Sequence, residues 1–244
     1  MFAILQISDT NTILRRPEIF SNRFDLPSGD AFFTVTTEKH LGKVPWKKLE
    51  SCLGILRQDL ITNRNITIPQ GINITVFTPD ILPRLILMNS ATEYITKHKD
   101  HFRSKTLTIF DEKGICESYT EKLIHYFKSI KIITDNPDKY EHVSQNLMKT
   151  YGFSLIVSQE CSFDSDVIIT HRCNVPVYFD GTVFTNERRF IMNATVFSGS
   201  EIRLPEEYEQ MRPSYIGGVL FASVLYEKCN EIKLGKLLYE DFGC

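Results

Sequence analysis

Four short apolar runs decide the fold of this chain: TLTIFD at 106–111, IKIITD at 130–135, FSLIVS at 153–158 and DVIITH at 166–171. Each run has the length and the β-branched content of a buried strand. Between the first three runs lie residues 118–127 and 138–151, and each of these segments is long enough for a crossover helix. Alternating strands and helices of this kind predict an α/β fold with a doubly wound parallel sheet.

The sequence after these runs indicates two more strands and two helices. Residues 175–179 and 190–197 read as strands, and the Asp-Gly pair at 180–181 reads as a turn. Residues 213–229 and 233–242 predict C-terminal helices, the first of them strongly apolar. We expect these helices to pack back on the sheet or on the N-terminal part of the chain, because large apolar faces usually serve a core. A homodimer through the C-terminal helices is the alternative.

The first hundred residues follow a different pattern. Residues 1–7, 31–36 and 72–77 read as strands, the last by its period-two alternation. Residues 45–61 predict an amphipathic helix, because large apolar residues recur there at steps of three and four. These residues are Trp46, Leu49, Leu53, Leu56 and Leu60.

The polar segment 98–105 is the expected linker, because the pattern changes there. We therefore expect an N-terminal α/β domain at 1–100. The domain at 101–244 would hold the doubly wound sheet and the C-terminal helices.

Composition excludes several classes of function. The net charge of -2 and the pI near 6.3 provide no basic surface, so we expect no nucleic-acid partner. The longest apolar stretch, 216–226, is far shorter than the ~20 residues of a membrane span. No export signal is recognisable at the start, and the six cysteines form no C-x-x-C pair. We expect a cytoplasmic protein with reduced thiols, and the abundance of Ile over Ala suggests a bacterium with an AT-rich genome.

The segment DEKGICES at 111–118 follows the first strand, where a dinucleotide-binding protein carries its glycine-rich turn. It contains one glycine, Gly114, and it places Asp111 and Glu112 where phosphates would lie. The backbone amides of Gly114 and Ile115 are the candidate pyrophosphate contacts. The alternative is that Gly114 only allows the chain to turn and that nothing binds there.

Asp135 ends the second strand, 21 residues beyond Gly114. An acid about 20 residues after the glycine turn can hydrogen-bond the ribose of an adenosine-containing ligand, and it favours NAD over NADP. The alternative is that Asp135 caps the helix that begins near Pro137.

Residues IITDN at 132–136 and SDVIIT at 165–170 resemble the Rossmann domains of shikimate dehydrogenase and glutamyl-tRNA reductase. The resemblance covers about 70 residues, and it implies that Thr170 and His171 lie beside the nicotinamide of a bound cofactor. The glycine turn departs from the pattern of that group. The first hundred residues also contain no match to the substrate-binding Lys and Asp of the dehydrogenases or to the catalytic Cys of the reductases, so their activity is not carried over.

Soft metal ligands occur at Cys161, His171 and Cys173, but their spacing is not that of a zinc site, and we expect no metal. The leading interpretation is a degenerate Rossmann-like module that binds a ligand or regulates, with neither catalysis nor a cofactor. The main alternative is an NAD-dependent oxidoreductase with an atypical phosphate turn, in which His171 donates a proton. A transferase with another adenosine ligand, such as S-adenosylmethionine, and a purely structural partner protein remain open.

Overall fold

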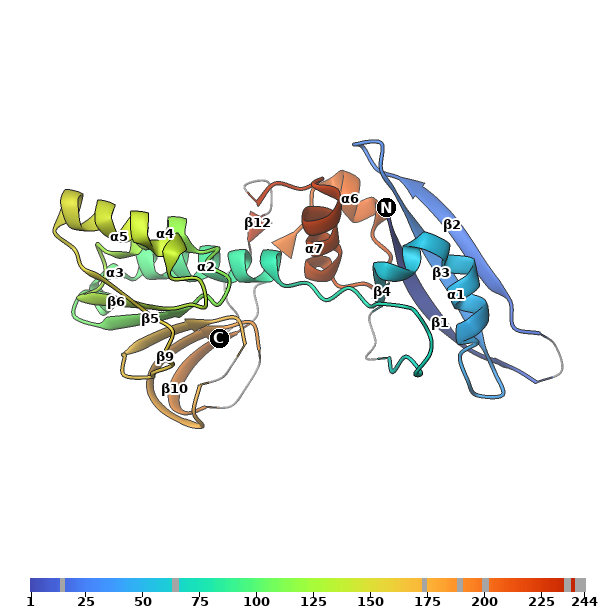
Figure 1. Cartoon of the computed structure of the whole chain (residues 1–244), viewed down its shortest axis with the longest axis horizontal. Coiled ribbons are helices and arrows are strands. Elements are labelled where there is room, and N and C mark those ends of the chain that lie inside the picture. The colour runs from blue at the N-terminus through green and yellow to red at the C-terminus, as the bar shows by residue number, and fades with distance from the viewer. Residues whose placement is uncertain are drawn as a thin grey trace. The chain divides into compact units, whose positions relative to one another are not determined.

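The computed structural model describes residues 1–13, 16–62, 66–172, 175–187, 191–198, 202–234 and 238–239. The chain forms two compact units (Figure 1). The first unit combines Met1–Asp80 with Leu204–Lys236, and the second combines Ile81–Arg203 with Leu237–Cys244. None of the described helices is long and apolar enough to cross a membrane.

The first unit is built on a mixed four-stranded sheet in the order β2-β3-β1-β4. Its strands are β1 (Phe2–Thr12), β2 (Ile19–Asp25), β3 (Ala31–His40) and β4 (Leu60–Thr62). β1 runs parallel to both β3 and β4, whereas β2 pairs antiparallel with β3 at the edge. The strands expected at 1–7 and 31–36 are therefore present.

Two expectations for the first unit are wrong. The helix expected at 45–61 ends early: α1 spans Trp46–Leu53, a short 3-10 helix η1 spans Gly54–Gln58, and β4 follows. Gly54 has φ +54°, which takes the backbone out of the right-handed helix. Residues 72–77 form no strand of their own, although Val76 makes one isolated bridge to Leu60.

Two helices, α6 (Glu206–Met211) and α7 (Gly218–Cys229), belong to the first unit, and α7 is the helix expected at 213–229. The helix expected at 233–242 is wrong at Leu238–Tyr239, which form the strand β12. Phe221 of α7 is fully buried, and its ring meets those of Phe2 and Phe32 edge-on at centroid distances of 6.4 and 5.5 Å. Edge-to-face packing of this kind is favourable for aromatic rings. The expectation that the apolar helix packs back on the chain is confirmed, and its partner is the N-terminal sheet. The residues from Gly218 to Tyr226 are all buried or half-buried.

The second unit contains a six-stranded sheet in the order β10-β9-β8-β5-β6-β7, and all neighbouring strands are parallel. Its strands are β5 (Thr106–Phe110), β6 (Ser129–Ile133), β7 (Leu155–Ser158), β8 (Val167–Thr170), β9 (Tyr178–Thr185) and β10 (Met192–Ser198). Numbered from β5, this is the 3-2-1-4-5-6 order of the Rossmann fold. The four apolar runs of the sequence form β5 to β8 in chain order, with β7 at one edge of the sheet. The turn expected at 180–181 is wrong, because both residues lie inside β9.

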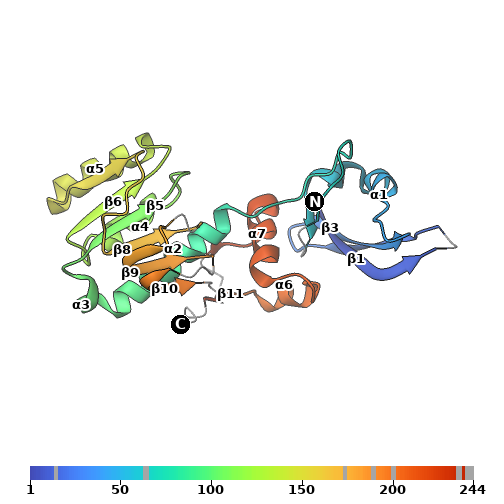
Figure 2. The same ribbon diagram turned by 90° about the horizontal axis from the view of Figure 1, so that it is seen from below.

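Helices cover one face of this sheet, as Figures 1 and 2 show. They are α2 (Ile81–Lys97), α3 (Lys99–Phe102), α4 (Glu117–Leu123) and α5 (Asp138–Tyr151). Ala91, Leu123 and Leu147 belong to the same buried cluster as Ile109 of β5. On the opposite face Ile168 is packed in a second cluster with side chains from loops and from β9. A short antiparallel pair, β11 (Ile202–Arg203) with β12 (Leu238–Tyr239), completes the unit.

The boundary between the units differs from the expected division at 100/101. α2 belongs to the second unit, because Leu87, Ala91 and Ile95 are buried in its core. The expected linker 98–105 contains α3 and the buried Phe102. Residues 204–236 return to the first unit rather than staying with the parallel sheet.

Candidate functional site

The strand order of the second unit changes direction between β5 and β8, and the turns at the carboxyl ends of such strands form the usual ligand crevice. Asp111 follows β5, Thr134 and Asp135 follow β6, and His171 follows β8. β6 and β8 flank β5, so Asp135 and His171 lie at the same edge of the sheet with β5 between them, roughly 10 Å apart at the level of the backbone.

Asp111 is fully buried, and its carboxylate fills the turn after β5. Its Oδ2 accepts hydrogen bonds from the Tyr140 hydroxyl at 2.6 Å and from the Cys116 backbone amide at 2.8 Å. Its Oδ1 is buried and has no hydrogen-bond partner in the part of the chain that the structure describes. The acid expected to repel a phosphate is therefore held inside the turn by α5 and by the start of α4.

The two titratable side chains beside Asp111, those of Tyr140 and Cys116, both have raised pKa values. Burial raises the pKa of the Tyr140 hydroxyl well above its ordinary value, and the neighbouring Asp111 charge and hydrogen bond raise it further. Burial likewise raises the pKa of the Cys116 thiol, with a smaller contribution from Asp111. A thiol with a raised pKa is a poor nucleophile, so Cys116 has a structural role here.

Glu112 connects the turn after β5 to two other elements. Its Oε2 lies 2.7 Å from Nη2 of Arg84, a residue of α2 that is only 5% exposed. Its carbonyl oxygen accepts hydrogen bonds from the Asp135 amide at 3.2 Å and from Nδ2 of Asn136 at 2.9 Å. The turns after β5 and β6 are thus joined directly through the backbone.

Gly114 adopts the left-handed conformation, with φ +64°, that allows the chain to reverse. Its amide donates to the Asp111 carbonyl oxygen at 3.0 Å. A Cβ at this position would lie 2.8 Å from Cδ of Lys139, whose Nζ donates to the Lys113 carbonyl oxygen at 3.0 Å. Ile115 is half-buried and packs against the core. The amides of Gly114 and Cys116 therefore have internal acceptors.

Asp135 has the opposite character. Its side chain is exposed, and its carboxylate makes no hydrogen bond or ion pair with the described residues. α5 has Pro137 at its N-cap and no side-chain cap, and Oγ1 of Thr134 accepts the Asn136 amide at 3.1 Å. The alternative in which Asp135 caps this helix is therefore not observed.

The side chains of Thr170 and His171 both lie within hydrogen-bond distance of neighbouring groups. Thr170 is buried, and its hydroxyl donates to the Arg172 carbonyl oxygen at 2.5 Å. Nδ2 of Asn186 donates to the Pro83 carbonyl oxygen at 2.9 Å and lies 2.8 Å from Nδ1 of His171. Since this amide nitrogen is the donor, Nδ1 accepts, and the neutral imidazole carries its proton on Nε2.

Sequence reasoning missed three residues of this arrangement: Arg84, Tyr140 and Asn186. Tyr140 offered a signal, because it precedes Leu147 by two helical turns and so lies on the buried face of α5. A tyrosine on a core face needs a partner for its hydroxyl. Arg84 and Asn186 offered none. No group of three His, Cys, Asp or Glu side chains gathers among the described residues, and Cys173 lies outside them.

Comparison with known proteins gives fold-level similarity only. No protein-family model matches the chain, and neither does any curated protein. The chain is similar to the crystal structure of L-tryptophan dehydrogenase from Nostoc punctiforme, at 12% identity and a TM-score of 0.35, over 86% of this chain and 66% of that one. It is also similar to quinate dehydrogenase from Corynebacterium glutamicum in complex with NAD, at 8% identity and a TM-score of 0.27, over 55% of this chain and 59% of that one.

A third similar structure is a chorismate mutase/shikimate 5-dehydrogenase fusion protein from Clostridium acetobutylicum, at 15% identity and a TM-score of 0.30, over 81% of this chain and 82% of that one. The chain thus spans about two thirds or less of the length of the first two dehydrogenases. TM-scores this low establish no shared activity. The Rossmann-like character of the second unit rests on its own strand order, which is that of the fold to which the sequence shows resemblance.

Proposed function

We propose that the second unit is a degenerate Rossmann-like module, with a binding or regulatory role and without catalysis, whose first turn is closed by its own side chains. The observation that carries this proposal is the buried Asp111 carboxylate, bonded to the Cys116 amide and the Tyr140 hydroxyl. In this module any adenosine-containing ligand is held through Asp135 and without a pyrophosphate contact at the turn after β5.

The electrostatics of the turn oppose a dinucleotide. Pyrophosphate binding needs free backbone amides and no negative charge beside them. Two like charges 4 Å apart repel by about 4 kcal/mol at the effective dielectric constant of a protein surface. Moving Asp111 away would break two hydrogen bonds, each worth about 1.5–3 kcal/mol when one partner is charged. The amides of Gly114 and Cys116 already have acceptors, and the charge of Asp111 opposes a pyrophosphate at this turn.

Asp135 supports the ligand-binding part of the proposal. Its exposed carboxylate accepts no hydrogen bond from the residues that the structure describes, so it is available to the two hydroxyls of a ribose. Adenosine and S-adenosylmethionine carry this ribose without a diphosphate, so the charge of Asp111 does not oppose them in the same way.

An NAD-dependent oxidoreductase is the second candidate. It is favoured by Asp135 together with the His171 ring, whose Nε2–H can donate a hydrogen bond to a substrate oxygen. In that case the cofactor is NAD, and the turn after β5 must rearrange when it binds.

Calorimetry and thermal-shift titration with NAD, NADP, adenosine, S-adenosylmethionine and ATP test the proposal. We expect no saturable binding of NAD, NADP or ATP, and binding of adenosine or S-adenosylmethionine that is lost in Asp135→Ala. A ligand at 100 times its Kd stabilises the protein by ~2.7 kcal/mol. Asp138→Ala is the matched control, because Asp138 is a second exposed acid three residues further on.

Saturable NAD binding that disappears in Asp135→Ala and survives in Asp138→Ala would contradict the proposal in favour of the oxidoreductase. If no ligand binds at all, the second unit serves as a scaffold only.

A further inference from the structure

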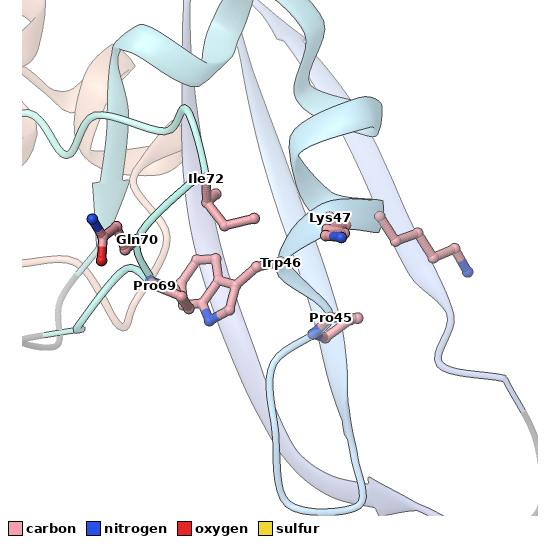
Figure 3. A pocket seen from close by; sticks show the side chains of 7 residues that line it. Pro45, Trp46, Lys47, Pro69, Gln70 and Ile72 are labelled. Atoms are coloured by element: carbon pink, nitrogen blue, oxygen red, sulfur yellow. The ribbon is translucent and has the colours of Figure 1, made fainter.

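The first unit contains a cavity of about 490 Å³ beside the start of α1. Figure 3 shows the Trp46 indole in its centre, with Ile72, Pro69 and Gln70 on one side and Pro45 and Lys47 on the other. The lining residues are Pro45, Trp46, Lys47, Lys48, Pro69, Gln70 and Ile72. This volume falls within the ~300–1,000 Å³ range of small-molecule sites.

The cavity has a mainly apolar wall with an aromatic surface. Trp46 is half-buried and packs against the core of the first unit, together with Ile72. Two prolines, Pro45 and Pro69, add rigid apolar rings. Flat rings stack favourably on an indole, so this wall favours an aromatic group over a flexible chain.

The two sides of the cavity are held in place by internal contacts. Residues 69–72 form a turn in which the Ile72 amide donates to the Pro69 carbonyl oxygen at 3.3 Å. The next amide, that of Asn73, donates to Oε1 of Glu50 on α1 at 2.8 Å. Leu49 and Leu53 fix α1 itself, because both are buried. The cavity is therefore formed by the fold, and its walls do not depend on a bound molecule.

The charged groups at the cavity are cationic. Its lining includes Lys47 and Lys48 and, among the described residues, no carboxylate. Lys48 donates to the Pro17 carbonyl oxygen, whereas Lys47 is exposed and has no ion pair in the described part of the chain. The indole Nε1–H of Trp46 likewise has no acceptor among the described residues. One cation and one N–H donor are thus available next to an aromatic wall.

We propose that this cavity binds an aromatic carboxylate, with the ring stacked on Trp46 and the carboxylate paired with Lys47. A charge-assisted hydrogen bond from the ammonium would orient the ring, and the Trp46 wall would supply the apolar contact. The site lies within the first unit and does not rest on the function proposed for the second.

Trp46 is the only tryptophan of the chain, so tryptophan-selective fluorescence reports on this cavity directly. The probe is benzoate, compared with the neutral benzamide and the non-aromatic cyclohexanecarboxylate. We expect a saturable change in Trp46 emission with benzoate, and about tenfold weaker binding of each of the other two compounds. A change that is linear in benzoate concentration, or equal affinity for benzamide, would overturn the proposal.

Two variants assign the contacts. Lys47→Gln should weaken benzoate about tenfold and leave benzamide unaffected, whereas Lys149→Gln, an exposed lysine on α5, should change neither. Trp46→Phe, followed by calorimetry, should weaken both aromatic compounds. Because Trp46 also packs on the core, circular dichroism must show that the Trp46→Phe variant is folded. If this variant is unfolded, the result for Lys47→Gln decides the proposal. Equal benzoate affinity in Lys47→Gln and Lys149→Gln would refute the assignment.

Discussion

The turns after β5 and β6 lie side by side at one edge of the same parallel sheet, yet the carboxylates of their acidic residues lie in opposite environments. Asp111 is fully buried and bonded to Tyr140 and Cys116. Asp135 is exposed and makes no hydrogen bond with its side chain to any part of the chain that the structure describes. The first acid stabilises the turn that it belongs to, whereas the second is free to meet a ligand. The position of an acid in a Rossmann-like fold therefore does not decide its role, and its internal partners do.

Replacing the buried acid should have the largest effect. Asp111→Ala leaves the Tyr140 hydroxyl and the Cys116 amide without their acceptor, and unpaired buried groups cost about 1–3 kcal/mol each. We expect a loss of about 3 kcal/mol in the free energy of unfolding, measured by urea denaturation. Asp135→Ala under the same conditions should leave the urea midpoint unchanged, because exposed side chains without partners contribute little. Similar losses in the two variants would remove the distinction between the turns.

Removing only the hydroxyl partner should have a smaller effect. Tyr140→Phe keeps the ring in the core but removes one hydrogen bond to a buried carboxylate, so we expect a loss of about 2 kcal/mol. The raised pKa of Tyr140 means that the folded state holds this proton more tightly than the unfolded state. Its stabilising contribution is complete below the ordinary value of 10.0 and declines as the pH rises above it.

The pH dependence gives a second measurement on the same variant. Urea midpoints between about pH 9 and pH 11 should fall less steeply in Tyr140→Phe than in the wild type. Parallel slopes would mean that Tyr140 is not the group that titrates.

Gly114→Ala tests the shape of the closed turn. A residue with a Cβ is strained at φ +64° by about 1–2 kcal/mol, and this Cβ would also displace the flexible Lys139 side chain. We expect a loss of about 1.5 kcal/mol in urea denaturation. Gly217→Ala is the control, because Gly217 has φ -64° and a Cβ there meets nothing within 4 Å. Equal stability of the two variants would show that the turn tolerates another backbone conformation.

The smallest expected effect is on the rate at which the cysteine thiols are alkylated. Cys116 is buried and its pKa is raised, so it should resist alkylation in the folded protein. Cys52 and Cys161 are exposed and should react under the same conditions. Peptide mapping by mass spectrometry after brief treatment with iodoacetamide measures both. Fast labelling of Cys116 would mean that the turn after β5 opens readily and could admit an anion.

Local patterns predicted much of the second unit. The helix expected at 138–151 is α5, because Pro137 favours its start and Gly152, with φ +64°, ends it. The strands β5 to β8 follow from short apolar runs rich in β-branched residues. The sequence also indicated that Asp111 opposes a phosphate at the turn after β5 and that Asp135 is a candidate ribose ligand, and both of these roles remain predictions.

The sequence by itself determined the α/β class, the parallel sheet and the candidate acids, because these depend on periodicity and on residue type over short stretches. Only the tertiary structure decided which residues form each unit, since Phe221 reaches Phe2 and Phe32 across more than 180 residues of chain. The tertiary structure also decided that the side chain of Asp111 is buried and that the side chain of Asp135 is exposed. That difference depends on Tyr140, which lies 29 residues from Asp111 and meets it only when α5 packs on the sheet.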